Sequence, residues 1–145
     1  MTVSLSQSER LLFKSLADYL IPASGKMPAA SSVGVHEDLL DRVLAARPDL
    51  GEGLKRGLAA CQEGTASEAL NALMKSDESA FQAISLAASG GYYMAAEVRE
   101  ELGYPGQGEA PYDPHETPAY LTNGMIERVV RRGSLYRPTA RTAKS

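Results

Sequence analysis

Residues 5–22, LSQSERLLFKSLADYLIP, decide the fold class. Ser6 and Glu9 stand three residues apart, as in a capping box, where each side chain binds a free backbone N–H of the other residue. Beyond them, leucines recur with the period of a helix at Leu12, Leu16 and Leu20. The proline that follows cannot continue a helix. The stretch therefore predicts a helix that begins after Ser6 and ends near Ile21.

Working outward, the rest of the chain repeats this helical period in segments that glycine and proline separate. A second capping box begins at Thr65, and Ser76 is the predicted cap of the next helix. We expect Gly90-Gly91 to break or bend that helix, and Thr117 to cap the last one. The further helices are expected at about 35–47, around Leu50 to Cys61, from 66 to 75, around Phe81 to Ala88, at 92–101, and at about 118–132 with an interruption at Asn123-Gly124.

The predicted fold is all-α, a small bundle of about six or seven short helices with an extended basic C-terminal arm. Glycines weaken the helix around Leu50 to Cys61, each by about 1 kcal/mol relative to alanine. The chain has 145 residues, which is the size of one domain. We expect a single helical domain over residues 1–136 and a flexible basic tail over residues 137–145.

Charge is distributed unevenly along the chain. From Met125 to Ser145 there are six basic residues and one acid, whereas the remaining residues include nine basic and 17 acidic ones. Domains that bind nucleic acid are usually basic overall, so we expect no nucleic-acid partner for this acidic chain. The longest apolar runs are too short to cross a membrane, and the N-terminus lacks a signal-peptide pattern. We therefore expect no membrane insertion and no export signal of the chain's own.

Catalytic and metal-binding motifs are missing from the sequence. It contains no HExxH, no zinc-like spacing of Cys and His, no GxSxG and no dinucleotide fingerprint. His36 and the acids after it could act as metal ligands in a small metal-dependent enzyme, but acids are favoured at any helix start. We therefore expect no catalytic, cofactor-binding or metal-binding residue in this chain.

Tyrosine is concentrated in the second half of the chain. Only Tyr19 lies in the first 90 residues, and the other six follow. Tyrosine joins apolar area to a polar tip and is enriched at protein interfaces. The cluster, with the basic arm, favours a partner-binding surface. Taken singly, Tyr93 and Tyr120 are expected to be core residues with satisfied hydroxyls. For Tyr104, a turn that packs it into the core of this chain is the alternative to a turn that presents it outward.

Several motifs resemble the gluconate 2-dehydrogenase subunit 3 family. The hallmark is GGYY at residues 90–93 followed by LGYPG at residues 102–106. The N-terminal third agrees, with LSQSER at residues 5–10, LADYLIP at residues 16–22 and SVGV at residues 32–35. The resemblance covers most of residues 4 to 112.

The resemblance implies an accessory subunit without a cofactor of its own. Its partner would be a large FAD-binding subunit of the glucose-methanol-choline (GMC) oxidoreductase type that oxidises a sugar, sugar acid or glycoside. Some such complexes also contain a cytochrome c. The complex would be cytoplasmic, or periplasmic if a signal on the partner exports both chains. The expected interface residues are Tyr92, Tyr93, Tyr104, Pro105, Tyr112, Arg128, Arg131, Arg132 and Tyr136. The alternative is a free-standing helical protein-interaction module that binds no flavoenzyme.

Overall fold

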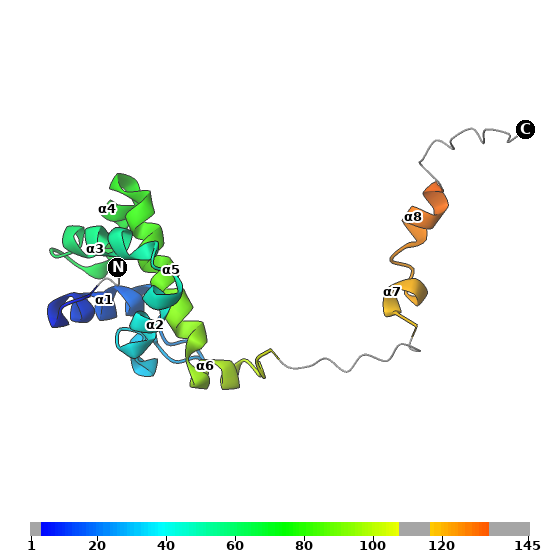
Figure 1. The fold of residues 1–145 in the computed structure, drawn as a ribbon, viewed down its shortest axis with the longest axis horizontal. Helices are drawn as coiled ribbons and strands as arrows, with labels where there is room; N and C mark the ends of the chain where they lie inside the picture. The colour runs from blue at the N-terminus through cyan, green and yellow to red at the C-terminus, as the bar shows by residue number, and fades with distance from the viewer. Residues whose placement is uncertain (1–3, 108–116, 134–145) are drawn as a thin grey trace, which may run out of the picture. The chain divides into compact units, whose positions relative to one another are not determined.

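Every regular element in the computed structural model, which describes residues 4–107 and 117–133, is helical (Figure 1). The all-α prediction is therefore confirmed. Residues 4–107 contain α1 (Gln7–Leu20), the short 3-10 helix η1 (Ala30–Val33), α2 (Asp38–Ala46), α3 (Leu50–Ala60), α4 (Ala66–Ser76), α5 (Glu78–Met94) and α6 (Ala96–Glu101). Residues 117–133 contain α7 (Ala119–Thr122) and α8 (Glu127–Arg132).

Contacts within the chain divide it after Gly108, whereas the sequence predicts a boundary after Tyr136. The first unit therefore includes α1 to α6, and the second includes α7 and α8. The predicted tail, residues 137–145, lies outside the described residues, so this part of the prediction stays a prediction.

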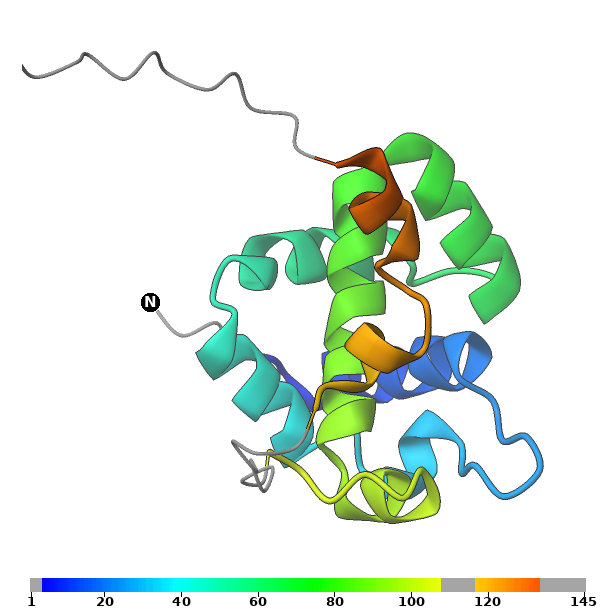
Figure 2. The same cartoon turned by 90° about the vertical axis from the view of Figure 1, so that its right-hand side faces the viewer.

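Helix α5 is the centre of the first unit and contacts α1, α2, α3, α4 and α6. In Figure 2 it stands upright, with α2 and α3 on one side and α4 on the other. Its inward face is rich in small residues, because Ala80, Ala83, Ala87 and Ala88 are all buried, together with the larger Ile84 and Tyr92. Small side chains let neighbouring helices approach closely. Most of the other large core side chains come from the surrounding segments, such as Phe13 of α1 and Leu54 of α3.

Both predicted capping boxes are present. The Ser6 N–H donates to Glu9 Oε2 at 2.7 Å, and the Thr65 N–H donates to Glu68 Oε2 at 3.1 Å. These backbone hydrogen bonds, with smaller contributions from the cap hydroxyls, hold the pKa of both glutamates below their ordinary value. The predicted cap of α5 was wrong, because Asp77 and not Ser76 accepts the hydrogen bond from the Ala80 N–H.

The predicted break at Gly90-Gly91 was also wrong, because α5 continues to Met94 and α6 begins at Ala96. A Cβ atom at Gly91 would lie only 3.0 Å from Val35 Cγ1, so this glycine makes room for a side chain on another segment. The glycines of α3 act similarly. A Cβ at Gly53 would lie 2.9 Å from Ala83 Cβ, and one at Gly57 would lie 2.8 Å from Ile84 Cδ1.

In the second unit, the predicted interruption between α7 and α8 is confirmed. Gly124 has a φ of 79°, and the Met125 N–H donates to Asn123 Oδ1 at 3.0 Å. The predicted cap at Thr117 was wrong, since α7 begins one residue later with Pro118 at the N-cap and no capping side chain.

Candidate functional site

The SVGV motif at residues 32–35 and the GGYY motif at residues 90–93 contact each other inside the first unit. Gly34 ends η1 with a φ of 72°, which places the next residue, Val35, in the core against Gly91. The Tyr92 hydroxyl donates to the Pro28 carbonyl at 2.7 Å. Segments about 60 residues apart in the sequence are thus joined through the motif residues.

The LADYLIP motif, residues 16–22, makes further hydrogen bonds to the segment that joins α1 to α2. Asp18 Oδ1 accepts a hydrogen bond from the Ser31 N–H at 2.7 Å, and the Ala30 N–H donates to the Ile21 carbonyl at 3.1 Å. These bonds fasten η1 to the end of α1. Most residues of the N-terminal motifs therefore have a structural role.

The two tyrosines of the GGYY motif point in different directions. Consecutive residues of an α-helix are about 100° apart around its axis, so one can be inside while the next is outside. Tyr92 is only 3 % exposed, and burial raises the pKa of its hydroxyl. Tyr93 is 59 % exposed, and its ring meets the Tyr92 ring edge-on with centroids 5.6 Å apart. Tyr92, expected at the interface, is therefore a buried core residue, whereas Tyr93, expected in the core as a single residue, is exposed.

Tyr93 lies in a shallow surface hollow of about 300 Å³. The hollow is lined by residues of α2, α3 and α5 together with Arg47. A second hollow of about 280 Å³ shares Arg47, Leu50 and Leu86 with it. We call the two together the α2–α3–α5 groove. The lining of the first hollow is Val43, Arg47, Leu50, Leu86, Ser89, Gly90 and Tyr93.

The charged groups of the groove are largely paired with one another. Arg47 Nη2 lies 2.7 Å from Asp49 Oδ2, and this hydrogen-bonded pair lowers the pKa of the aspartate and raises that of the arginine. Arg56 Nε lies 3.1 Å from the carboxylate of Asp77, which also caps α5. The hollow beside Tyr93 is thus mostly apolar, the second hollow is more polar, and the charges beside them nearly balance. Sequence reasoning missed Leu86, because its exposure depends on which face of α5 the other helices cover.

The LGYPG motif forms the end of α6 and presents Tyr104 outward. Gly103 has a φ of 64°, its N–H donates to the Glu100 carbonyl, and the Tyr104 N–H donates to the Arg99 carbonyl, each at 2.9 Å. This is the Schellman arrangement, which favours glycine at the left-handed position. Tyr104 is 53 % exposed and Pro105 is exposed, so Tyr104 does not pack into the core.

The remaining expected interface residues lie in the second unit or outside the described residues. Arg128, Arg131 and Arg132 are exposed in α8, where Arg131 Nη2 lies 3.8 Å from Glu127 Oε2. Tyr120, which was also expected in the core when taken as a single residue, is exposed in α7. Tyr112 and Tyr136 lie outside the described residues.

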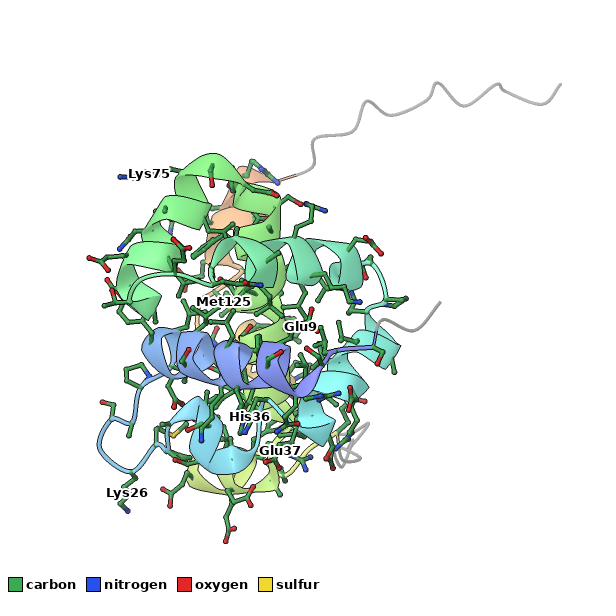
Figure 3. The ribbon with its side chains drawn as sticks, turned by 90° about the vertical axis from the view of Figure 1, so that its left-hand side faces the viewer. Glu9, Lys26, His36, Glu37, Lys75 and Met125 are labelled. Atoms are coloured by element: carbon green, nitrogen blue, oxygen red, sulfur yellow. The ribbon has the colours of Figure 1, made fainter. Side chains whose placement is uncertain are left out.

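The residues around His36 fasten α2 to α1 (Figure 3). Arg10 donates to the carbonyls of His36 and Glu37 at 3.3 and 3.1 Å, and its Nη2 lies 2.6 Å from Asp41 Oδ1. Sequence reasoning missed this contact, which joins residues about 30 positions apart. His36 Nε2 lies 3.5 Å from Glu37 Oε1. Residues 4–107 and 117–133 contain no group of three or more His, Cys, Asp or Glu side chains that could hold a metal ion.

Comparisons with known proteins gave no match to a family model, to a curated protein or to a solved structure. The resemblance to the gluconate 2-dehydrogenase subunit 3 family thus rests on the motifs alone. Among the helices that the structure describes, none has the length and apolar character needed to cross a membrane.

Proposed function

We propose that this chain is a non-catalytic small subunit that binds and stabilises a large FAD-dependent subunit of the GMC type. That subunit would oxidise a sugar, sugar acid or glycoside and would hold the FAD, with a cytochrome c as an optional further component. The complex would work in the cytoplasm, or in the periplasm after export with a signal-bearing partner.

The observation that carries the proposal is the exposure of Tyr93 and Tyr104, one from each hallmark motif. Many other motif residues pack in the core, cap a helix or form a turn, whereas these two side chains are more than half exposed, and Tyr93 contacts the buried Tyr92 ring edge-on. Tyrosine is among the residues that dominate binding energy at protein interfaces. Tyr93 also lines a mostly apolar hollow, and the fully buried core of a protein interface is typically apolar.

The direct test is expression of a GMC-type large subunit from the same genome, with and without this chain. We expect the large subunit to be soluble, loaded with FAD and active only when the two chains are expressed together. The measurements are copurification, flavin absorbance per protein and dehydrogenase activity. The proposal fails if the large subunit is soluble, flavin-loaded and fully active alone.

Point variants localise the contact. We expect Tyr93→Ala and Tyr104→Ala each to weaken binding by about thirtyfold, which corresponds to a typical interface anchor of about 2 kcal/mol. Tyr19→Ala is the matched control, because Tyr19 is similarly exposed but lies on α1. Equal affinity of all three variants would remove the two motif tyrosines from the interface. A pull-down from native cells that recovers partners but no flavoprotein would favour the free-standing interaction module instead.

A further inference from the structure

The loop that joins α1 to η1, residues 22–29, is longer than its connection requires. The Ala30 N–H donates to the Ile21 carbonyl at 3.1 Å, so the two ends of the loop are already in contact. The residues between them therefore bridge no distance and form an excursion on the surface. Compact surface loops whose ends are close together are frequently functional. We call residues 22–29 the α1–η1 loop.

The α1–η1 loop is held in place by hydrogen bonds within itself and to the core. The Ser24 N–H donates to the Met27 carbonyl at 3.0 Å, and the Met27 N–H donates to the Ser24 carbonyl at 2.9 Å. Gly25 has a φ of 57°, which suits a tight two-residue turn. At the base, the Pro28 carbonyl accepts the hydrogen bond from the Tyr92 hydroxyl, and Met27 packs against the core. A loop fixed in this way loses little conformational entropy when it binds.

The tip of the loop carries one long charged side chain among small ones. Lys26 is exposed, and in Figure 3 its side chain points away from the helices. It is the only charged residue in residues 19–35, and the preceding Ala23, Ser24 and Gly25 are small and exposed. A narrow tip that ends in an ammonium group is complementary to a depression that contains carboxylates.

The position of the loop connects it with one of the tyrosines on which the proposed function rests. The loop and α6 lie at the same end of the first unit (Figures 2 and 3). The turn that follows α6 presents Tyr104, so a large partner that contacts Tyr104 can reach the loop as well. An anionic membrane suits the loop less well, because each lysine near such a surface contributes only about 1 kcal/mol and the loop contains one.

We propose that the α1–η1 loop is a preformed contact that inserts into an acidic depression of the large flavin-dependent subunit, where the Lys26 ammonium group binds carboxylates. This inference deepens the proposed function and rests on it, because that function supplies the partner. The loop adds a charged contact, fixed in position before binding, to the aromatic contacts of Tyr93 and Tyr104.

The first test compares two lysine variants of the full chain, with the purified large subunit as the binding partner. We expect Lys26→Glu to raise the Kd by about thirtyfold or more, because a carboxylate would then face the acidic depression. Lys75→Glu is the matched control, since Lys75 is an exposed lysine of α4 at the other end of the first unit in Figure 3. It makes the same change in net charge, and its Kd should stay within about twofold of the wild type. Both variants should keep the unfolding midpoint of the wild type, because both side chains are exposed.

The second test separates insertion from a contact at the edge of the interface. Lys26→Met keeps most of the side-chain length but removes the charge. If the ammonium group is buried with carboxylates, the variant should dissociate at least about tenfold faster, with little change in the association rate. Surface plasmon resonance at low and high salt measures both rates. A change confined to the association rate and its salt dependence would place Lys26 at the rim and overturn the insertion.

The outcomes separate the loop contact from the proposed function. If the wild-type chain binds the large subunit and Lys26→Glu binds equally well, the loop contact is overturned and the proposed function stands. If the wild-type chain does not bind, the proposed function fails and the loop contact fails with it. Equal weakening by Lys26→Glu and Lys75→Glu would show a general effect of net charge and overturn the loop contact. The same holds if Lys26→Glu abolishes binding to phosphatidylserine vesicles while its affinity for the large subunit is unchanged.

Discussion

Residues 4–107 and residues 117–133 both form helices, but apolar side chains are buried in the first range and exposed in the second. In the first range α1 buries Phe13, Leu16 and Ala17. In the second range α7 and α8 bury none, although Leu121 and Val130 are equally apolar. Capping side chains do not separate the two ranges: α1, α4 and α5 begin with one, whereas α2, α3 and α6 of the first range and α7 and α8 of the second do not.

The contrast separates two sources of helix stability. Short helices are marginal by themselves, and most of their stability in proteins comes from packing an apolar face. The first range provides that packing internally, around α5. Within residues 117–133 neither helix contains a buried residue.

Truncation of an apolar residue in each range should give the largest difference in the free energy of unfolding between the two ranges. We expect Phe13→Ala to lower the free energy of unfolding by about 3–5 kcal/mol, because it opens a cavity in a fully buried site. Val129→Ala in α8 should change it by less than about 0.5 kcal/mol. Urea denaturation followed by circular dichroism measures both. A similar loss for the two variants would show that the second range shares the stability of the first.

Replacement of a glycine by alanine should destabilise the protein where the glycine allows two helices to pack closely, and not elsewhere. Helix propensity alone predicts that Gly53→Ala stabilises α3 by about 1 kcal/mol. We expect instead a loss of about 1–3 kcal/mol, because the new Cβ would lie 2.9 Å from the rigid Ala83 methyl group.

Gly90→Ala is the control for this prediction, because its Cβ would lie 3.4 Å from Val43, an ordinary contact. It should be neutral or stabilising by up to about 1 kcal/mol in the same urea experiment. Stabilisation by Gly53→Ala would mean that α3 and α5 do not need close approach.

Removal of a single hydroxyl group tests the different roles of neighbouring tyrosines. Tyr92→Phe should cost about 1 kcal/mol, because the hydrogen bond to the Pro28 carbonyl is lost inside the core. Tyr93→Phe should have no measurable effect on the unfolding midpoint, since Tyr93 is exposed. Equal effects would contradict the assignment of Tyr92 to the core.

The smallest expected effect is a pH dependence that arises at the two capping boxes of the first range. The pKa of Glu9 and of Glu68 lies below the ordinary 4.5 because both carboxylates accept cap hydrogen bonds. A lowered folded-state pKa contributes stability that is present above pH 4.5 and is lost as the pH falls through the lowered value.

The double variant Glu9→Gln and Glu68→Gln keeps an acceptor at both caps but cannot titrate. Between about pH 6 and about pH 3, its thermal midpoint should therefore fall slightly less than that of the wild type. Parallel pH profiles would show that the two caps contribute nothing that depends on ionisation.

The helical pattern, both capping boxes and the interruption before Met125 are predictable from the sequence because they depend on residues three or four positions apart. Ser6 with Glu9 and Thr65 with Glu68 are such pairs. The candidate site is less predictable. The left-handed glycine of the LGYPG turn follows from local geometry, but the exposure of Leu86 and the position of the α2–α3–α5 groove do not.

The sequence by itself determined that this protein is built of helices, and roughly where each begins and ends, since those signals are local. Only the tertiary structure decided that Gly91 continues a helix, and that Tyr92 lies inside while Tyr93 lies outside. These outcomes depend on Val35 and Pro28, which are about 60 residues away along the chain. No local pattern in the sequence records a contact made across that distance.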